Sequence, residues 1–127
     1  MINVLIVDDH EDVAEIIEMM LEDSKLDANL VTCKDAFEGY DKMNETPFQL
    51  IFTDYNMPRV NGLEYIKSIR NSNGKSRDAI ICLISGHQPN LDIEEHAYQD
   101  VYFVMKPFQK SKINFYVKLA FSKFNKD

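Results

Sequence analysis

Five short apolar runs recur along the chain, and each is followed by a segment whose apolar residues have helical spacing. The runs are rich in Val, Ile, Leu and Phe, which is typical of strands buried on both faces. Apolar residues three or four positions apart are typical of helices with one buried face. The predicted strands cover residues 2–7, 28–32, 48–53, 79–84 and 101–105, and the predicted helices lie near 13–21, 35–44, 63–70, 89–97 and 113–124.

The regular alternation of strand and helix predicts the fold class. Strands that are joined through helices by short connections pair in parallel with right-handed crossovers. We therefore expect an α/β protein with a doubly wound parallel sheet and helices on both faces. No repeat, linker or change of composition divides the 127 residues, so residues 1–127 are expected to form a single domain.

Charge and cysteine content narrow the setting in which the protein works. The net charge of −7 disfavours direct binding to nucleic acid. Residues 101–127 hold six lysines and a single acid, so the rest of the chain is strongly acidic. Cys33 and Cys82 form no C-x-x-C motif, which favours a reducing compartment. We find no signal peptide and no apolar run long enough to span a membrane, so we expect a cytoplasmic protein that does not bind membranes.

Candidate chemistry collects directly after the apolar strands. Ligands of doubly wound sheets bind beyond the carboxyl ends of the strands. Asp8 and Asp9 follow the first predicted strand, Asp54 the third, Ser85 the fourth and Lys106 the fifth. Any one of these residues alone is more often a helix cap or a surface group. Their combination at the ends of four strands predicts one shared polar site.

Three carboxylates in one pocket repel each other unless a cation neutralises them. Carboxylate oxygens suit Mg²⁺, which also accepts the oxygens of a phosphate. Lys106 adds an ammonium group and Ser85 a hydroxyl donor. A carboxylate nucleophile, a divalent ion, a lysine and a hydroxyl are the parts needed for in-line phosphoryl transfer to an aspartate.

The same residues lie in motifs of a known family. These motifs are V-L-I-V-D-D-H at 4–10, T-D-Y-N-M-P-R-V-N-G at 53–62, L-I-S-G at 83–86 and K-P-F at 106–108. The chain resembles bacterial response-regulator receiver domains over essentially its whole length. The resemblance implies a flavodoxin-like sheet of five parallel strands in the order 2-1-3-4-5, with five helices. Because no second domain is predicted after the last helix, we expect a stand-alone receiver without an output domain.

The resemblance assigns a role to each site residue. Asp54 matches the phosphorylated aspartate, and it would also bind Mg²⁺. Asp9 matches a direct Mg²⁺ ligand, and Asp8 matches an acid that holds the ion through water. Asn56 lies where the family uses a backbone carbonyl as a metal ligand. Ser85 and Lys106 match the residues that grip the phosphoryl group.

Three further expectations concern switching and the lifetime of the phosphorylated state. Phe103 lies at the family's aromatic switch position and would turn inward when Ser85 moves toward the phosphoryl group. The alternative is an ordinary core phenylalanine. His87 lies where side chains tune attack by water on the aspartyl phosphate, or it is a surface loop residue. The Lys106–Pro107 bond is expected to be cis.

As a family member, the chain would act in two-component phosphorelay signalling. It would accept its phosphoryl group from a histidine kinase or a histidine phosphotransfer protein. It would then switch partner binding through the face formed by the segments 89–97, 101–105 and 113–124. It would be no enzyme beyond self-catalysed phosphotransfer and autodephosphorylation. The sequence identifies neither the downstream protein partner nor the oligomeric state, although Phe115 and Leu119 lie off the main apolar stripe of the last helix and fit a partner surface.

Several alternatives remain open. Gln99-Asp100 replaces a common Gly-Ala step, and residues 88–93 are atypical, so the signalling face differs from the usual pattern. A degenerate receiver would bind partners without phosphorylation. An aspartate-nucleophile phosphatase would turn over phosphate esters, but such enzymes typically carry D-x-D after the first strand. A flavin-binding variant is disfavoured because an acidic loop would repel the flavin phosphate.

Overall fold

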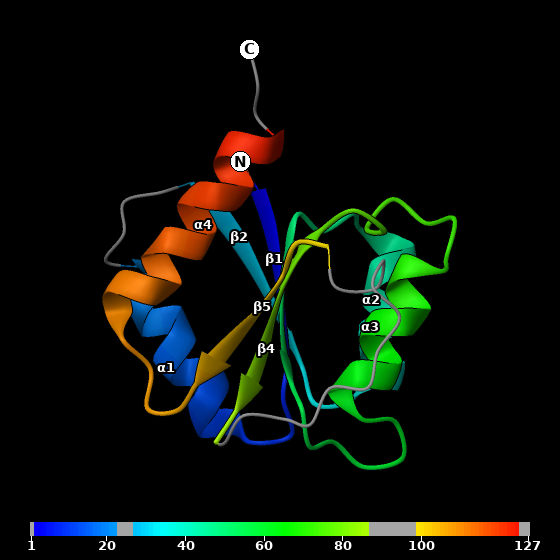
Figure 1. The fold of residues 1–127 in the computed structure, drawn as a ribbon, viewed down its shortest axis with the longest axis horizontal. Helices are drawn as coiled ribbons and strands as arrows, with labels where there is room; N and C mark the ends of the chain where they lie inside the picture. The colour runs from blue at the N-terminus through cyan, green and yellow to red at the C-terminus, as the bar shows by residue number, and fades with distance from the viewer. Residues whose placement is uncertain (1, 23–26, 87–98, 125–127) are drawn as a thin grey trace.

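We describe the protein from a computed structural model, which covers residues 2–22, 27–86 and 99–124. Strands and helices alternate through most of the chain (Figure 1). The elements in order are β1 (Ile2–Val7), α1 (Glu11–Glu22), β2 (Ala28–Cys33), α2 (Ala36–Glu45), β3 (Leu50–Asp54), α3 (Gly62–Arg70), β4 (Ile80–Ser85), β5 (Val101–Met105) and α4 (Lys110–Phe124).

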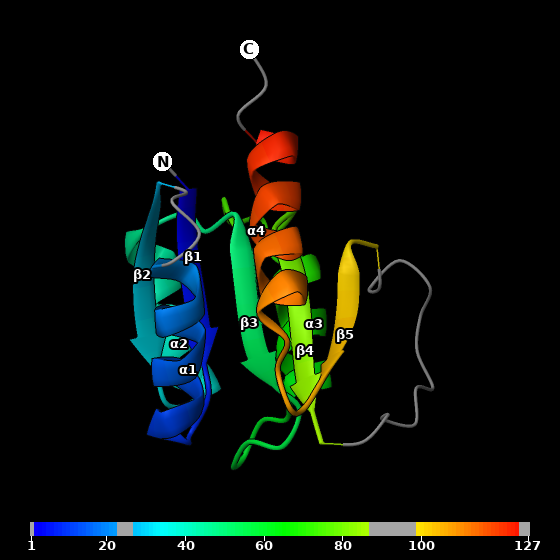
Figure 2. The same cartoon turned by 90° about the vertical axis from the view of Figure 1, so that its left-hand side faces the viewer.

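The strands form one five-stranded sheet in the order β2-β1-β3-β4-β5, and all neighbouring pairs are parallel. This confirms the predicted fold class and strand order, which is the flavodoxin-like arrangement. Figure 2 shows the strands side by side with all their carboxyl ends at one edge of the sheet. That edge is where ligands of such sheets bind.

The sheet separates two apolar cores. Helices α1 and α4 cover one face, and α2 and α3 cover the other (Figure 1). Side chains of β1 alternate between the two cores: Val4 and Ile6 face α1 and α4, whereas Leu5 and Val7 face α2 and α3. The strands β1, β3 and β4 are almost entirely buried because they are covered on both faces. This explains why their sequences are nearly continuous apolar runs.

Local sequence sets the starts of two helices. The Asp35 side chain accepts a hydrogen bond from the Glu38 backbone N–H and caps α2. Asn61 and Glu64 form a capping box at the start of α3, in which each side chain accepts from the other residue's backbone. The capping box fixes where the β3–α3 loop ends.

The structure shifts the ends of three predicted strands, and the second strand runs to Cys33 rather than to residue 32. The third strand was predicted over 48–53 but spans Leu50–Asp54, because the Phe48 N–H donates to the Ser76 Oγ instead of joining the ladder. The fourth strand includes Ser85, which pairs with Met105. Asp54 and Ser85 are therefore the last residues of their strands rather than loop residues.

The described part of the chain contains four helices, not the five that were predicted. The predicted helix at 89–97 lies outside the described residues. Within residues 2–22, 27–86 and 99–124, no helix has the length and apolar character needed to cross a membrane.

Gln99 and Asp100, which replace the common Gly-Ala step, lie at the amino end of β5. Asp100 has a positive φ of 58°, a backbone conformation that favours glycine. Its carboxylate accepts from Lys123 Nζ at 2.6 Å, and the same ammonium donates to the Asp78 carbonyl at 2.7 Å. The buried Arg70 guanidinium donates to the carbonyls of Ala79 and Gln99, both at 2.8 Å. These bonds hold the amino ends of β4 and β5 against α3 and α4.

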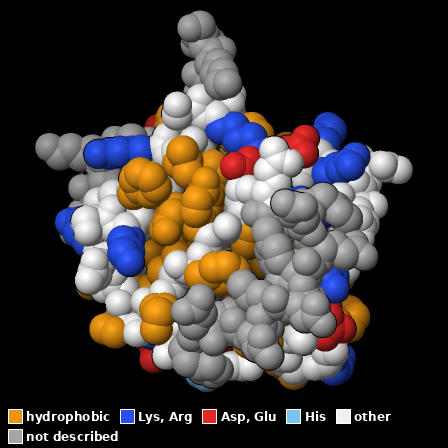
Figure 3. Space-filling view, in the orientation of Figure 1, with side chains coloured by type: hydrophobic (Ala, Val, Ile, Leu, Met, Phe, Trp, Pro, Cys, Tyr) orange, Lys and Arg blue, Asp and Glu red, His pale blue; other side chains and the backbone are white. Residues whose placement is uncertain are grey.

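The last helix buries a narrower stripe than its aromatic content suggested. Ile113, Val117 and Ala120 are buried, whereas Phe115 is 57% exposed. Leu119, which was predicted to lie off the stripe together with Phe115, is half-buried and packs against the core. Figure 3 shows apolar side chains gathered on this side of the molecule, over α4 and β5.

Candidate functional site

The carboxyl edge of the sheet brings together the predicted polar residues. Asp8 follows β1, and its N–H donates to the Cys33 carbonyl at the end of β2. Asp54 ends β3 opposite Ile84 of β4. The Lys106 N–H donates to the Ser85 carbonyl at 3.0 Å. Backbone pairing between neighbouring strands thus brings these residues to one edge of the sheet.

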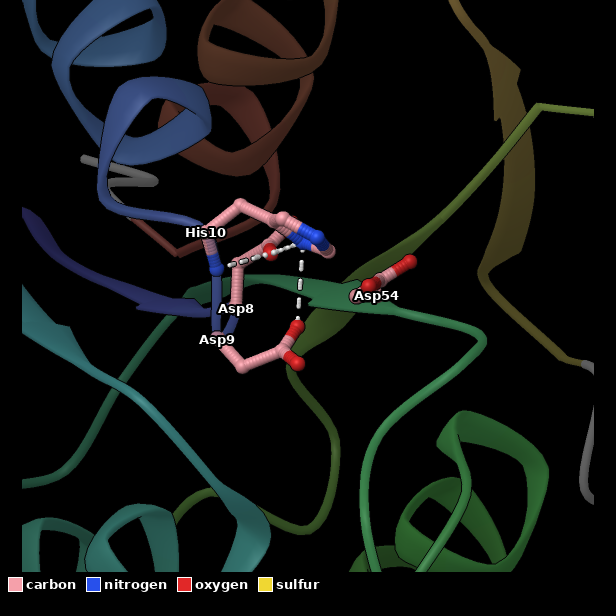
Figure 4. Close-up of side chains that lie close together, drawn as sticks. All are labelled: Asp8, Asp9, His10 and Asp54. Atoms are coloured by element: carbon pink, nitrogen blue, oxygen red, sulfur yellow. Dashed lines mark hydrogen bonds and ion pairs between the residues drawn. The ribbon is translucent and has the colours of Figure 1, made fainter.

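An acidic cluster lies at the centre of this edge. Asp8 and Asp54 are each 4% exposed, whereas Asp9 reaches solvent. Ligand atoms of Asp8, Asp9, Asp54 and His10 all lie within 4.8 Å of one another. Figure 4 shows the four side chains together at the ends of β1 and β3. Residues that lie far apart along the chain therefore form a single site.

His10 is the site residue that sequence reasoning missed. Its Nδ1 lies 3.1 Å from the Asp8 Oδ1 and 3.1 Å from the Asp9 Oδ1 (Figure 4). Its backbone N–H donates to the same Asp8 oxygen at 2.8 Å. The available signal was its place in V-D-D-H, directly after the two acids. Nothing in the sequence pattern showed that the ring turns back over them.

Burial and like charge perturb the carboxylates. Burial raises the pKa of Asp8, against the lowering effect of the hydrogen bonds from His10. Burial also raises the pKa of Asp54, and the neighbouring Asp8 charge raises it further. The Lys106 ammonium and a hydrogen bond from the Asn56 backbone N–H act in the opposite direction on the pKa of Asp54. The pKa of the exposed His10 is raised, first by its hydrogen bond to Asp8 and then by the Asp9 charge.

The donor set fits a divalent cation. Asp8 Oδ2 is buried and has no hydrogen-bond partner among the described residues. An unpaired buried carboxylate oxygen is costly unless a cation or donor satisfies it. Asp8, Asp9 and Asp54 supply the oxygen ligands that Mg²⁺ prefers. The Asn56 backbone N–H bonds Asp54, and the assignment of its carbonyl as a metal ligand stays a prediction.

The remaining predicted residues flank this cluster. Ser85 is buried at the end of β4, and Phe103 is half-buried against the core beneath α2 and α3. Two positions separate them in the β4–β5 ladder, since Phe103 pairs with Leu83 and Ser85 pairs with Met105. The Lys106–Pro107 bond is cis, as expected. His87 lies outside the described residues, so its tuning role stays a prediction.

Gly62 explains the spacing of the motif at 53–62. A Cβ at this position would lie 2.5 Å from the Asp54 carbonyl oxygen, 2.6 Å from Leu83 Cδ1 and 2.9 Å from the Tyr55 Cα. The Gly62 N–H also donates to the Tyr55 carbonyl at 2.9 Å. The start of α3 can therefore press against the backbone of Asp54 only because residue 62 has no side chain.

Arg59 attaches the β3–α3 loop to the neighbouring helix α2. Arg59 has a positive φ of 70°, and its guanidinium lies 3.5 Å from the Asp35 carboxylate. The guanidinium also lies 4.7 Å from the centre of the Phe37 ring. The loop that follows Asp54 is thus attached to the start of α2.

Comparison with known families shows which family the chain belongs to. The family model described as the response regulator receiver domain matches residues 4–118. The chain belongs to this family. The match includes every residue of the acidic cluster, together with Ser85 and Lys106.

Individual relatives of this receiver domain are distant. It is 29% identical over 108 residues to the response regulator ArlR of Staphylococcus epidermidis, covering 85% of this chain and 47% of that protein. It is 24% identical over 112 residues to protein PilG of Pseudomonas aeruginosa, covering 88% and 82%. The chain thus spans about half the length of ArlR but most of PilG.

Solved structures support the fold. The chemotaxis response regulator CheY4 of Vibrio cholerae superimposes with a TM-score of 0.77 at 21% identity, covering 94% of this chain and 98% of that one. A response regulator receiver domain protein from Clostridium thermocellum gives a TM-score of 0.79 at 19% identity, covering 98% of each chain. The receiver fold is therefore retained although most residues differ.

The raised pKa of Asp54 predicts how stability depends on pH. The folded state keeps this proton to a higher pH than the unfolded chain, so the metal-free parent loses stability as pH rises from about 4 through the raised pKa. We expect Asp54→Asn to be more stable than the parent at pH 7, by on the order of 1 kcal/mol, because a neutral amide avoids the cost of a buried charge. Urea unfolding in EDTA between pH 4 and 8 measures this. The exposed Asp41→Asn serves as a control, and a less stable Asp54→Asn would contradict the interpretation.

A second prediction concerns Gly62. We expect Gly62→Ala to destabilise the fold by about 1–3 kcal/mol, the usual cost of overpacking, and to weaken Mg²⁺ binding because the Asp54 backbone is displaced. Gly74→Ala is the matched control, since its Cβ would meet only Ser72 Oγ at 3.6 Å. Denaturant unfolding and Mg²⁺ titration of both variants provide the comparison. Equal stability of the two variants would rule out close packing at Gly62.

Proposed function

We propose that this receiver domain accepts a phosphoryl group on Asp54 from a histidine kinase or a histidine phosphotransfer protein, with Mg²⁺ in the acidic cluster. One observation carries the proposal. The Asp54 carboxylate lies at the carboxyl end of the central strand, with ligand atoms of Asp8 and Asp9 within 4.8 Å. The relatives named as response regulators support the same role.

The transfer itself needs no further nucleophile. A carboxylate oxygen of Asp54 forms a bond to phosphorus while the phosphorus–nitrogen bond of the donor phosphohistidine breaks. The electron pair of that bond stays on the imidazole nitrogen, and Asp54 becomes an acyl phosphate. Attack of water on phosphorus later releases inorganic phosphate and restores the carboxylate. In this proposal the domain catalyses only the gain and the loss of the phosphoryl group on its own Asp54.

Charge balance assigns the supporting roles. Mg²⁺, when bound, would neutralise the acids and the phosphoryl oxygens. The Lys106 charge lowers the pKa of both Asp8 and Asp54, and in this proposal it would pair with a phosphoryl oxygen. Ser85 lies buried at the end of the neighbouring strand and would donate its hydroxyl to the same group. These groups favour the phosphorylated state because they supply positive charge and hydrogen-bond donors where a dianion appears.

Two open grooves lie beside α1 and reach the edge of the acidic cluster at Asp8 and His10. One holds about 400 Å³ and runs between α1 and β2, with Asp8 in its lining. The other holds about 390 Å³ between the start of α1 and Lys106, Pro107 and Phe108. The helix carries acids and no base along its length. A phosphodonor protein with a basic, partly apolar surface fits this approach.

Phosphorylation would then be read on β5 and α4. A new dianion that draws in Ser85 changes the packing next to Phe103, which is half-buried two ladder positions away. The domain would shift between two packings of this face, which carries the exposed side chains of Met105 and Phe115. We propose that the segment 89–97 forms part of the same signalling face. We also propose that the protein works in the cytoplasm of a bacterium.

Labelling with acetyl phosphate tests the acceptor. We expect Mg²⁺-dependent phosphorylation of the parent and of Asp41→Asn, seen as retarded bands on a phosphate-affinity gel, and none in Asp54→Asn. Equal labelling of Asp54→Asn would show that another residue is the acceptor. An unlabelled parent would favour a phosphorylation-independent binding module. Continuous hydrolysis of a phosphate monoester would favour the phosphatase.

Beryllofluoride, a stable mimic of the phosphoryl group, tests the switch. We expect it to shift the NMR signals of the Phe103 ring and of β5 and α4 in the parent. In Ser85→Ala the same addition should leave those distant signals nearly unchanged, although Mg²⁺ still binds. Equal shifts in both proteins would show that Ser85 does not transmit the change, and unchanged Phe103 signals in the parent would assign Phe103 to the core alone.

A further inference from the structure

His10 adds a nitrogen donor to the acidic cluster. Its Nδ1 lies 3.1 Å from a carboxylate oxygen of Asp8 and 3.1 Å from one of Asp9. One of the two ring nitrogens of His10 also lies within 4.8 Å of the Asp54 ligand atom. The backbone N–H of His10 also donates a hydrogen bond to Asp8, which holds the His10 backbone beside the cluster. The ring thus turns toward the acids although its side chain is 59% exposed.

A second observation shows that this cluster lacks a ligand. The Asp8 side chain is fully buried, and its Oδ2 has no hydrogen-bond partner within the described residues. Its other oxygen already accepts from both the backbone and the ring of His10. The unpaired oxygen therefore marks a position for a cation next to the imidazole.

The types of ligand atom determine which cation the site binds most tightly. Mg²⁺ is a hard ion that prefers oxygen and gains little from an imidazole. Mn²⁺, Co²⁺ and Zn²⁺ bind imidazole nitrogen well, and their affinity for mixed nitrogen and oxygen sites rises along the first transition row. Three carboxylates with one imidazole therefore form a mixed site that discriminates between these ions and Mg²⁺.

We propose that His10 Nδ1 is a direct ligand in this cluster, so that the site binds first-row transition-metal dications more tightly than Mg²⁺. The inference rests on the proposed function, because it uses the same three acids. Without metal, an Nδ1–H would donate to Asp8 and Asp9. With a transition metal, the Nδ1 lone pair would coordinate the ion; an imidazolium would release its Nδ1 proton to solvent, whereas a neutral ring would carry its proton on Nε2.

The variant His10→Gln tests this inference through metal affinity. Co²⁺ and Mg²⁺ dissociation constants are measured by calorimetry for the parent, for His10→Gln and for Glu18→Gln, which removes an acid of the adjacent helix α1 outside the cluster. We expect His10→Gln to weaken Co²⁺ binding by about tenfold or more while Mg²⁺ binding changes by less than about twofold. Glu18→Gln should weaken both ions equally and slightly.

A spectroscopic measurement identifies the ligand directly. In the Co²⁺-loaded parent, NMR should show strongly shifted imidazole protons from one histidine. They should be missing in His10→Gln and kept in His96→Gln. Shifted imidazole protons that persist in His10→Gln, or an equal loss of Co²⁺ and Mg²⁺ affinity, would overturn the role of His10. If Asp54→Asn binds both ions as tightly as the parent, the proposed acidic metal site itself fails, which is a separate outcome.

Discussion

Repulsion between buried carboxylates is the constraint on which the rest of this domain depends. Asp8 and Asp54 are both almost fully buried at the carboxyl edge of the sheet, and each raises the cost of charging the pocket. The Lys106 ammonium offsets only part of this cost, and one oxygen of Asp8 stays unpaired within the described residues. Such a pocket favours the binding of a positively charged group. In the proposed function a divalent cation would relieve the repulsion, and the bound cation would in turn attract the incoming phosphoryl group.

The opposite edge of the sheet shows the contrast. There the Asp100 carboxylate binds Lys123, and the Arg70 guanidinium donates to carbonyls on both neighbouring strand starts. The charges of Arg70, Lys123 and Asp100 are thus satisfied within the chain. Their bonds hold α3, α4 and the two strand starts together.

Close backbone packing sets the position of Asp54 in the acidic pocket. Gly62 lets the start of α3 lie directly against the Asp54 carbonyl, and Arg59 attaches the intervening loop to α2. On the other side, Lys106 is hydrogen-bonded through its backbone to Ser85. Asp54 therefore has closely packed neighbours on both sides. In the proposed function, a change of charge at Asp54 would be transmitted to β4 and β5 rather than absorbed by a loop.

The sequence by itself determined the order of the elements, the parallel sheet and the edge at which Asp8, Asp54, Ser85 and Lys106 meet. Apolar periodicity reports which face of each element is buried, and strand order then places the strand ends. Only the tertiary structure decided the burial of Asp8, the inward turn of His10 and the close contact at Gly62. These depend on where neighbouring loops direct their side chains and backbone, and a one-dimensional pattern carries no record of that direction.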